Sequence, residues 1–365
     1  MTDSPAALLT IDLGALAANY RLLANKAAPA EAAAAVKASG YGLGLEPVVR
    51  TLADNGCRTF FVATLDEGIE LRALFPDAII CVLNGLIAGD PADFKEHRLI
   101  PALNDLGQVA AWRDWARDNP GAPAVLHLDT GMARLGLPPQ ELDILAAESA
   151  RLDGIQLALI MSHLACADEQ DHPMNRQQRD AFAAALARLP SAPASLAASS
   201  GIFLGPQYHF DMVRPGVCLH GVNPQPGRPN PMVPVVRLQA KILQIRDVDT
   251  PQTVGYGATH RCAGPTRLAT VAAGYADGYL RSLSGRGMAH FRDMPVPVVG
   301  RVSMDLITLD VTQAPEARPG DMVDLIGPHH DVDALAAEAG TIGYEIMTSL
   351  GRRYHRLYVN GGGGD

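Results

Sequence analysis

Short apolar runs, separated by longer mixed segments, mark the first 230 residues of the chain. Most of these runs are apolar at successive positions, as expected of parallel strands that are buried on both faces. The predicted strands are residues 32–36, 59–64, 78–83, 99–103, 124–128, 155–161, 195–198 and 212–219. Helix-like segments lie between them, for example at 107–118, 140–152 and 176–189.

Eight strands that alternate with helices predict a (β/α)8 barrel of the TIM type. The alternative is a doubly wound open sheet, but no Gly-x-Gly-x-x-Gly motif follows the first strand. Near the start of the chain, residues 8–11 resemble a short strand, and Asp12 is a suitable N-cap for the helix that follows.

The pattern changes after about residue 230, where strand-like runs follow one another without long helices. These runs, at 235–248, 267–273, 296–302 and 322–326, predict an all-β domain. Short helices are expected near 332–339 and 342–350, followed by a last strand near 356–359. The Pro- and Asn-rich segment 223–234 is the expected linker, and glycines 361–364 are expected to be disordered.

Composition narrows the class of protein. The chain has 365 residues, 48% of them hydrophobic, and a net charge of −9 with no basic run of the kind that binds nucleic acid. The cysteines are scattered without a C-x-x-C pair, and the histidines lack ligand spacing, so neither a disulfide framework nor a metal site is expected. No membrane span and no basic leader are seen, which predicts a cytoplasmic protein.

Candidate chemistry begins at Lys37, which ends an apolar run and precedes a loop with three glycines, residues 38–44. Burial of a lysine lowers its pKa and makes it available as a nucleophile, for example toward a carbonyl cofactor. Glycines allow the backbone to approach an anion closely. A surface lysine before a loop would show the same local pattern, so the motif gains weight only with the rest of the chain.

Lys37 and the loop after it resemble the pyridoxal-phosphate lysine motif of the alanine racemase family, although Ser39 and Gly40 replace its usual Asn or Asp and Ala. With the motifs below, the resemblance covers nearly the whole chain. It implies a barrel at residues 12–230 and a β domain at 231–365, which the N-terminal strand at 1–11 joins. It also implies pyridoxal 5′-phosphate as the cofactor and, for Tyr41, a hydroxyl that contacts its phosphate.

Residues 129–136, DTGMARLG, resemble the family's D-T-G-M-x-R-L-G motif. The resemblance implies that Arg134 binds the substrate carboxylate, and a guanidinium can do so with two parallel hydrogen bonds. Many members carry a carbamylated lysine two residues before the motif to orient this arginine. This chain has His127 there, so no carbamate is expected and another group must orient Arg134.

Three further residues follow predicted strands of the barrel. His163, in residues 161–168, matches the family histidine that bonds the arginine at the cofactor ring, although a structural core histidine would look the same. Asp168 matches a residue at the entrance to the site and could equally cap a helix. Ser200 matches the serine that binds the cofactor phosphate, and a simple N-cap serine would share its geometry.

The segment RPGV at 214–217 resembles the family's R-P-G-I. It implies that Arg214 faces the cofactor's pyridine nitrogen and that Gly216 and Val217 offer backbone N–H groups to the phosphate. Arginine keeps its proton at working pH, so the ring nitrogen stays unprotonated. The substrate carbanion is then less delocalised, which favours reprotonation and hence racemisation. His220 replaces the family's usual tyrosine.

Racemisation needs acid/base groups on both faces of the substrate carbon. The resemblance assigns them to Lys37 and to Tyr256, in the segment VGYGAT at 254–259. Tyr256 would reach the site of the partner subunit in a head-to-tail homodimer. In the same domain, Met304 would offer its N–H to the substrate carboxylate, and Tyr275 would narrow the entrance.

The function implied is an alanine racemase that interconverts L- and D-alanine and supplies D-alanine for peptidoglycan. The alternative within the family is a racemase of serine or another amino acid. A fold-related decarboxylase would need a cysteine motif that is absent here, and a non-catalytic pyridoxal-phosphate-binding barrel would lack the second domain.

Overall fold

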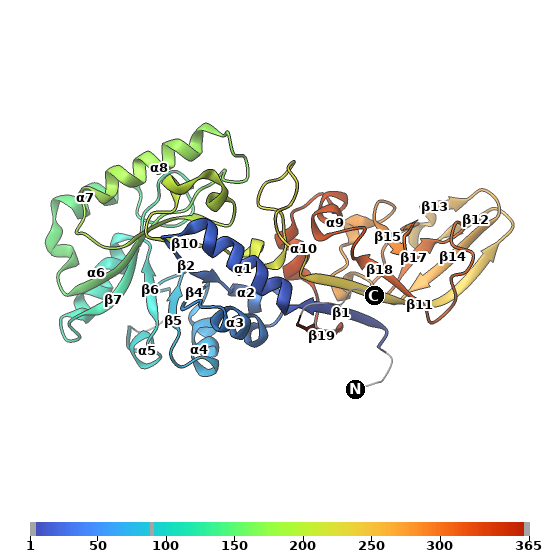
Figure 1. Ribbon diagram of the computed structural model, residues 1–365, viewed down its shortest axis with the longest axis horizontal. Coiled ribbons are helices and arrows are strands. Elements are labelled where there is room, and N and C mark those ends of the chain that lie inside the picture. Colours follow the sequence, from blue (N-terminus) through green and yellow to red (C-terminus); the bar gives the residue numbers. More distant parts are fainter. Residues whose placement is uncertain (1–4, 88–90, 361–365) are drawn as a thin grey trace.

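The computed structural model describes residues 5–87 and 91–360. Glycines 361–364, expected to be disordered, lie outside the described residues. The chain forms two parts that lie end to end along the long axis, a helix-covered barrel and a strand-rich domain (Figure 1).

The barrel is a parallel sheet of nine strands in the described part of the chain. Its strands are β2 (Glu31–Ala32), β3 (Ala34–Ala35), β4 (Thr59–Val62), β5 (Ile79–Val82), β6 (Ile100–Leu103), β7 (Ala122–His127), β8 (Ile155–Met161), β9 (Ala194–Ala198) and β10 (Met212–Arg214). Strands β2 and β3 are two halves of one interrupted strand. Because β2 pairs with β10 and β3 pairs with β4, they close the sheet, and the predicted eight-stranded barrel is confirmed.

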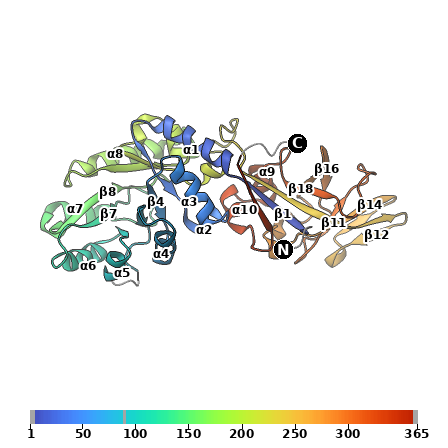
Figure 2. The ribbon, with the colours of Figure 1, turned by 60° about the horizontal axis from the view of Figure 1, so that its bottom comes forward.

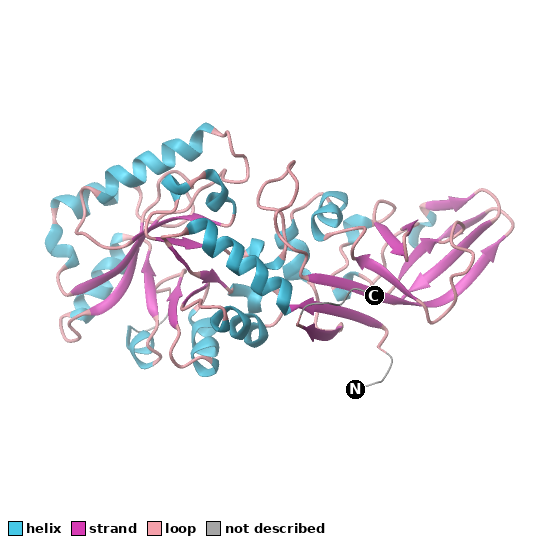
Figure 3. Cartoon of the chain, viewed as in Figure 1, coloured by secondary structure: helices cyan, strands magenta, loops and turns pink. Residues whose placement is uncertain are grey.

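Helices cover the outside of this sheet (Figure 3). They are α1 (Leu13–Ala27), α3 (Leu45–Asp54), α4 (Leu65–Leu74), α5 (Pro91–Glu96), α6 (Leu106–Ala116), α7 (Pro139–Ala147) and α8 (Pro173–Leu186). Asp12 caps α1 as predicted, since its Oδ1 accepts the N–H of Ala15 at 2.9 Å. The predicted strand 212–219 is too long. It ends at Arg214 because Pro215 has no N–H to continue the ladder, and a short 3₁₀ helix, Val217–His220, follows.

The second sheet has the order β16-β15-β18-β11-β1-β19, and β14 and β17 continue from β11. Its strands are β1 (Ala7–Asp12), β11 (Val236–Val248), β14 (Thr266–Val271), β15 (Met288–Phe291), β16 (Met294–Pro297), β17 (Ile307–Asp310), β18 (Met322–Ile326) and β19 (His355–Val359). The first strand, β1, runs antiparallel to β11 and parallel to β19. The hairpin of β12 (Gln252–Val254) and β13 (His260–Cys262) forms the tip of the molecule farthest from the barrel (Figure 1).

The strand predicted at 296–302 is wrong in its extent. Strand β16 ends at Pro297, and β15 and β17 on either side were not predicted. Pro295 and Pro297 are tolerated because β16 is an edge strand, where an N–H is not needed on the solvent side.

Two short helices, α9 (Val332–Ala339) and α10 (Gly343–Ser349), complete the second domain. Both ribbon views place α10 between the barrel and the second sheet (Figures 1 and 2). Within the described residues, no helix combines the length and apolarity needed to cross a bilayer.

The second domain directly supports the loop that follows Lys37. Arg356 on β19 donates to the carbonyl of Gly42 at 2.8 Å, and the Tyr358 hydroxyl donates to the carbonyl of Leu43 at 2.8 Å. A Cβ on Gly42 would lie 2.5 Å from the carbonyl oxygen of Met347 in α10, so only glycine fits there. The two domains of one chain are therefore joined at the lysine loop.

Candidate active site

Lys37 follows β3 at the carboxyl end of the barrel. The residues after it adopt the left-handed backbone conformation, which L-residues disfavour. Ala38 and Ser39 both have φ of 53°, and Tyr41 has φ of 54°. Such a left-handed run costs free energy at each residue that is not glycine and persists only where neighbouring groups hold it. Lys37 is therefore followed directly by a strained turn.

Glu67, on the first turn of α4, holds this strained turn. Its Oε1 accepts the N–H of Ala38 at 2.7 Å, while its Oε2 accepts the N–H of Ala63 at 2.7 Å. One carboxylate thus bridges the ends of β3 and β4. Burial lowers the pKa of Lys37, with Arg134 adding to the effect and Glu67 opposing it.

Tyr41 lies against the backbone of the loop after β10. A Cβ on Gly216 would lie 2.2 Å from the Tyr41 hydroxyl oxygen, so the phenol occupies the space that any other residue would need. Ser199 Oγ accepts the N–H of Gly216 at 3.0 Å and the N–H of Cys218 at 3.3 Å. Because the Gly216 N–H already donates to Ser199, the Val217 N–H is the one of the two predicted backbone donors that remains open among the described residues.

Ser200 stands directly after Ser199 and is half-buried. It starts the 3₁₀ helix Ser200–Leu204, whose first N–H groups have no acceptor within the helix. The structure therefore gathers a phenol, a serine hydroxyl and backbone N–H groups at the ends of β9 and β10.

Arg214 is buried with only 6% of its surface exposed, and its guanidinium has several partners. Its Nη1 donates to Ser195 Oγ, and its Nη2 donates to the carbonyl of Ser162 at 2.7 Å and lies 3.5 Å from His163 Nδ1. Burial lowers the pKa of Arg214 to about 10, so the group stays charged near neutral pH.

The histidines near this arginine are neutral near pH 7. Burial, with Arg214 beside the ring, lowers the pKa of His163 to about 3. Burial likewise lowers the pKa of His127 to about 4. His127 Nδ1 lies 2.7 Å from Asn104 Oδ1, and Asn104 in turn donates to the carbonyls of Leu83 and Ala102. A neutral, fixed imidazole thus stands where many family members are expected to carry a negative charge.

Asp129 organises the loop that carries Arg134. Its Oδ1 accepts the N–H groups of Gly131 and Met132 at 2.9 and 2.8 Å, and its Oδ2 accepts that of Ala133 at 3.0 Å. Arg134 itself is exposed, and no hydrogen bond or ion pair to its side chain is seen within the described residues. The loop is therefore fixed, while the guanidinium remains open to an anion.

His220 is buried beside Tyr41, with ring centroids 5.1 Å apart. Neither of its ring nitrogens has a hydrogen-bond partner among the described residues. Burial lowers the pKa of His220 to about 3, which keeps the ring neutral.

The predicted residues of the second domain lie outside this cluster and are exposed. Tyr256 is 73% exposed in a turn between β12 and β13, with the Arg301 side chain packed under the neighbouring Gly257. Met304 is 53% exposed and Tyr275 is 43% exposed. The structure does not bring Tyr256 to Lys37 within one chain.

Tyr344, which the sequence did not single out, stands over the lysine loop. Its ring, carried by α10, lies 6.3 Å from that of Tyr41. Burial raises the pKa of Tyr344, with smaller contributions that include the exposed Asp168. The role of Asp168 as an entrance residue stays a prediction. No pattern distinguishes Tyr344 from an ordinary helix residue, because its position depends on the contact between the domains.

No group of three metal-ligating side chains gathers in residues 5–87 or 91–360. The cysteines of the chain are all free thiols, four of them buried.

Comparison with known proteins decides the family. The model for the alanine racemase N-terminal domain matches residues 11–224, and the model for the alanine racemase C-terminal domain matches residues 235–358. This chain belongs to the alanine racemase family. It is 53% identical over 361 residues to the alanine racemase of Rhodospirillum rubrum, covering 98% of this chain and 96% of the relative.

Other members of the family are similar over the whole length. A catabolic alanine racemase of Mesorhizobium japonicum is 50% identical, with 97% of this chain and 94% of the relative covered. The crystal structure of the Bartonella henselae alanine racemase, with covalently bound pyridoxal phosphate, matches with a TM-score of 0.94 at 40% identity. The match covers 97% of this chain and 99% of that structure, so the predicted family is confirmed.

Proposed function

We propose that this chain interconverts L-alanine and D-alanine with pyridoxal phosphate bound at the carboxyl end of the barrel. The observation that carries the proposal is the half-buried Lys37, held by Glu67 at the mouth of a barrel whose floor carries the buried Arg214. The residues present fit the cofactor. Tyr41, which packs against Gly216, together with Ser200 and the Val217 N–H, has the donors that a phosphate requires.

Bound pyridoxal phosphate supplies an electron sink for the bond between the substrate's α-carbon and its proton. Arg214 would limit that sink, since its guanidinium keeps its protons and would transfer none to the cofactor. His163, neutral and 3.5 Å from Arg214, supports the guanidinium without adding charge. The arrangement therefore favours return of a proton to the α-carbon over other reactions.

Lys37 holds or accepts the proton on one face of the α-carbon, and Tyr256 does so on the other. Arg134 and the Met304 N–H bind the carboxylate of alanine, and Tyr275 limits the size of its side chain. Tyr256 is 73% exposed in the turn between β12 and β13, which supports a head-to-tail homodimer in which it enters the partner's barrel. The division at residues 11 and 230 and a cytoplasmic location remain predictions.

The absorbance spectrum of the purified protein tests the cofactor assignment. We expect a band near ~420 nm that borohydride removes and that Lys37→Ala lacks. Racemisation of L-alanine, D-alanine and serine on the same sample then defines the substrate, and both directions matter because relatives named catabolic are 50% identical. Absence of the band after addition of pyridoxal phosphate contradicts the proposal, and faster turnover of serine supports the alternative substrate.

Mixing inactive subunits tests the dimer. Lys37→Ala and Tyr256→Phe are each expected to be inactive as homodimers, whereas a hybrid contains one site with both groups intact. Random association should restore about a quarter of the wild-type activity. If both groups acted within one chain, the mixture would stay inactive.

A further inference from the structure

Two turns of the second domain, which carry Tyr275 and Met304, are joined through their backbones. The N–H of Tyr275 donates to the carbonyl of Ser303 at 3.0 Å, and the N–H of Ala276 donates to the carbonyl of Met304 at 3.0 Å. A Cβ on Gly274 would lie 2.3 Å from the Met304 carbonyl oxygen, so no larger residue allows this approach. The two turns therefore behave as one unit.

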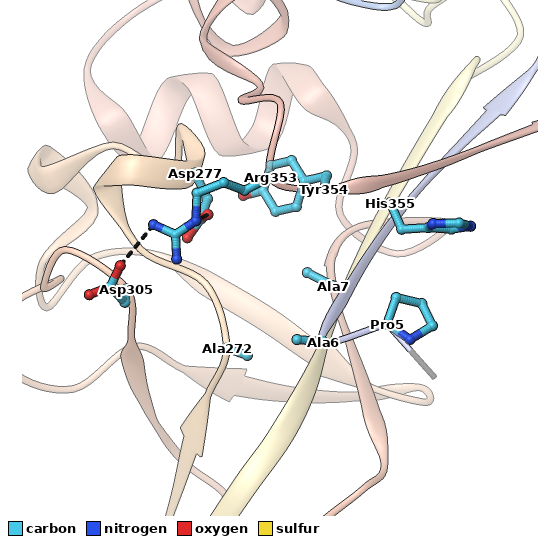
Figure 4. A pocket seen from close by; sticks show the side chains of 9 residues that line it. All are labelled: Pro5, Ala6, Ala7, Ala272, Asp277, Asp305, Arg353, Tyr354 and His355. Atoms are coloured by element: carbon cyan, nitrogen blue, oxygen red, sulfur yellow. Dashed lines mark hydrogen bonds and ion pairs between the residues drawn. The ribbon is translucent and has the colours of Figure 1, made fainter. Parts of the chain in front are cut away.

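A single guanidinium spans both turns from a third segment. Arg353 Nε lies 3.0 Å from Asp277 Oδ1, and its Nη1 lies 2.8 Å from Asp305 Oδ1 (Figure 4). Asp277 is two residues after Tyr275, and Asp305 is the neighbour of Met304. The side chain of Arg353 thus ties together the two turns within two residues of Tyr275 and Met304, which are proposed to face the substrate.

The inner ion pair anchors the arrangement. The side chain of Asp277 is 6% exposed, and its Oδ2 also accepts the N–H of Gly274 at 2.9 Å. Burial raises the pKa of Asp277, whereas the Gly274 N–H and Arg353 act in the opposite direction. Removing the guanidinium would leave this carboxylate nearly buried without its cation, which is costly.

Packing alone does not hold the guanidinium. The side chain of Arg353 is 54% exposed, as is that of Asp305. Arg353 borders a cavity of about 480 Å³, together with Ala6, Ala272 and His355 (Figure 4). Because this space is open, the position of Arg353 depends on its two carboxylate partners.

The segment that carries Arg353, residues 349–353, also leads to the chain's own barrel. The N–H of Gly351 donates to the carbonyl of Asp277 at 2.9 Å, and a Cβ on Gly278 would lie 2.0 Å from the carbonyl oxygen of Ser349. Ser349 ends α10, the helix whose Tyr344 stands beside Tyr41. Residues 349–353 therefore connect the lysine loop of one site with the residues proposed to enter the other site.

We propose that Arg353 is a positioning residue that fixes the spacing of Met304 and Tyr275, and thereby the carboxylate subsite and the width of the entrance. This inference rests on the proposed function, which places both residues in the partner's site. It gives Arg353 no contact with the cofactor, so the loading of Lys37 is independent of it. A lysine at this position carries one compact charge and cannot bridge both carboxylates.

Steady-state kinetics of the cofactor-loaded Arg353→Gln dimer test the proposal. We expect KM for alanine to rise roughly tenfold or more, because a small displacement of a binding group has a large effect. The value of kcat should fall less, and the ~420 nm band should be unchanged. Arg353→Lys should be intermediate, and turnover of serine relative to alanine should increase as the entrance widens.

Arg352→Gln is the matched control, since it removes the same charge from the neighbouring exposed position, where no ion pair is seen. Asp305→Asn provides a second variant that removes only the outer ion pair and should raise KM in the same direction. A KM within about twofold of wild type for both variants overturns the proposal. So does an equal fall in kcat and thermal stability with unchanged KM, which would indicate a structural role only.

Hybrid dimers separate this inference from the proposed function. With Lys37→Ala in excess over Arg353→Gln, the one intact site pairs a normal barrel with a normal Arg353, so KM should return to the wild-type value. A raised KM in the hybrid would place the effect of Arg353 in its own barrel and overturn the inference. Failure of the Lys37→Ala and Tyr256→Phe mixture would instead contradict the proposed dimer.

Discussion

The mouth of the barrel and the tip of the second domain differ in how completely each is built. At the barrel, Arg214 is 6% exposed with three polar neighbours, and Glu67 binds the ends of two strands at once. At the tip, Tyr256 is 73% exposed in a turn that belongs to a two-stranded hairpin. In one region the side chains are held by several polar contacts, and in the other they point outward.

Charge follows the same division. The barrel mouth gathers the cations Lys37, Arg134 and Arg214, while burial keeps His127 and His163 neutral. A cluster of cations next to neutral rings suits an anionic cofactor and a carboxylate substrate. The second domain presents the Tyr256 phenol and the Met304 backbone N–H, which in the proposed function act opposite such a cluster. The proposed function makes the two regions complementary parts of one site.

Tyr256→Phe is the strongest test of this division. Removing the phenol from the tip should lower kcat for racemisation by roughly 10²- to 10⁴-fold, the range for loss of an acid/base group. The barrel half should be unaffected, so the cofactor band near ~420 nm and its removal by borohydride should persist. Racemisation at near wild-type rate would show that the tip carries no essential group.

Arg134→Gln tests whether the exposed guanidinium serves the substrate. Because the side chain has no partner among the described residues, its loss should not disturb the loop that Asp129 holds. We expect KM for alanine to rise by about 10- to 100-fold, as for loss of a bidentate charge pair. Arg151→Gln, on the outside of the barrel, is the control. A change in kcat alone would argue against carboxylate binding.

Glu67→Gln should weaken the link between the turn after Lys37 and the end of β4. The amide can accept only one of the two N–H groups of Ala38 and Ala63 well, and it removes the charge that opposes the lowering of the Lys37 pKa. We expect a roughly tenfold fall in kcat, since Lys37 is less well placed.

Competitive acetylation of the apoprotein measures the same variant without turnover. The exposed Lys26 and Lys95 serve as internal standards for the reactivity of Lys37 at each pH. The apparent pKa of Lys37 should be lower in Glu67→Gln than in the wild type. An unchanged value would show that Glu67 does not act on the lysine.

His220→Phe should have the smallest effect and concerns stability. Burial lowers the pKa of His220 from 6.5 to about 3, so the folded chain holds the ring neutral while the unfolded chain binds a proton below about pH 6.5. The free energy of unfolding should therefore fall as the pH drops from about 6.5 toward 3. The variant should lose up to about one proton from that dependence, measured by denaturant unfolding at several pH values. An unchanged slope would contradict the assignment.

Much of the fold and the barrel half could be predicted because their signals are local. Buried parallel strands are continuous apolar runs, and Lys37, Arg134 and Arg214 each stand in a short motif near a strand end. The strand at 296–302 was misplaced because an edge strand with prolines lacks the apolar continuity of a central one.

Glu67, Asn104, Tyr344 and Arg353 could not be predicted, since each acts through contacts between segments far apart in the chain. Glu67 resembles an ordinary capping residue of α4, and its role is visible only when the end of β3 lies beside it. Arg353 joins two turns that are about 50 and 75 residues away from it.

The contacts of β19 with the lysine loop form late, because of the order in which the chain is synthesised. Arg356 and Tyr358, which bind the carbonyls of Gly42 and Leu43, are synthesised 314 and 315 residues after these partners. Their strand, β19, also pairs with β1, so segments far apart in the sequence meet there. A nascent chain can close its barrel long before this contact forms. Cofactor capture is therefore expected only after β19 has formed, and a chain truncated before β19 would keep a barrel whose lysine loop is untethered.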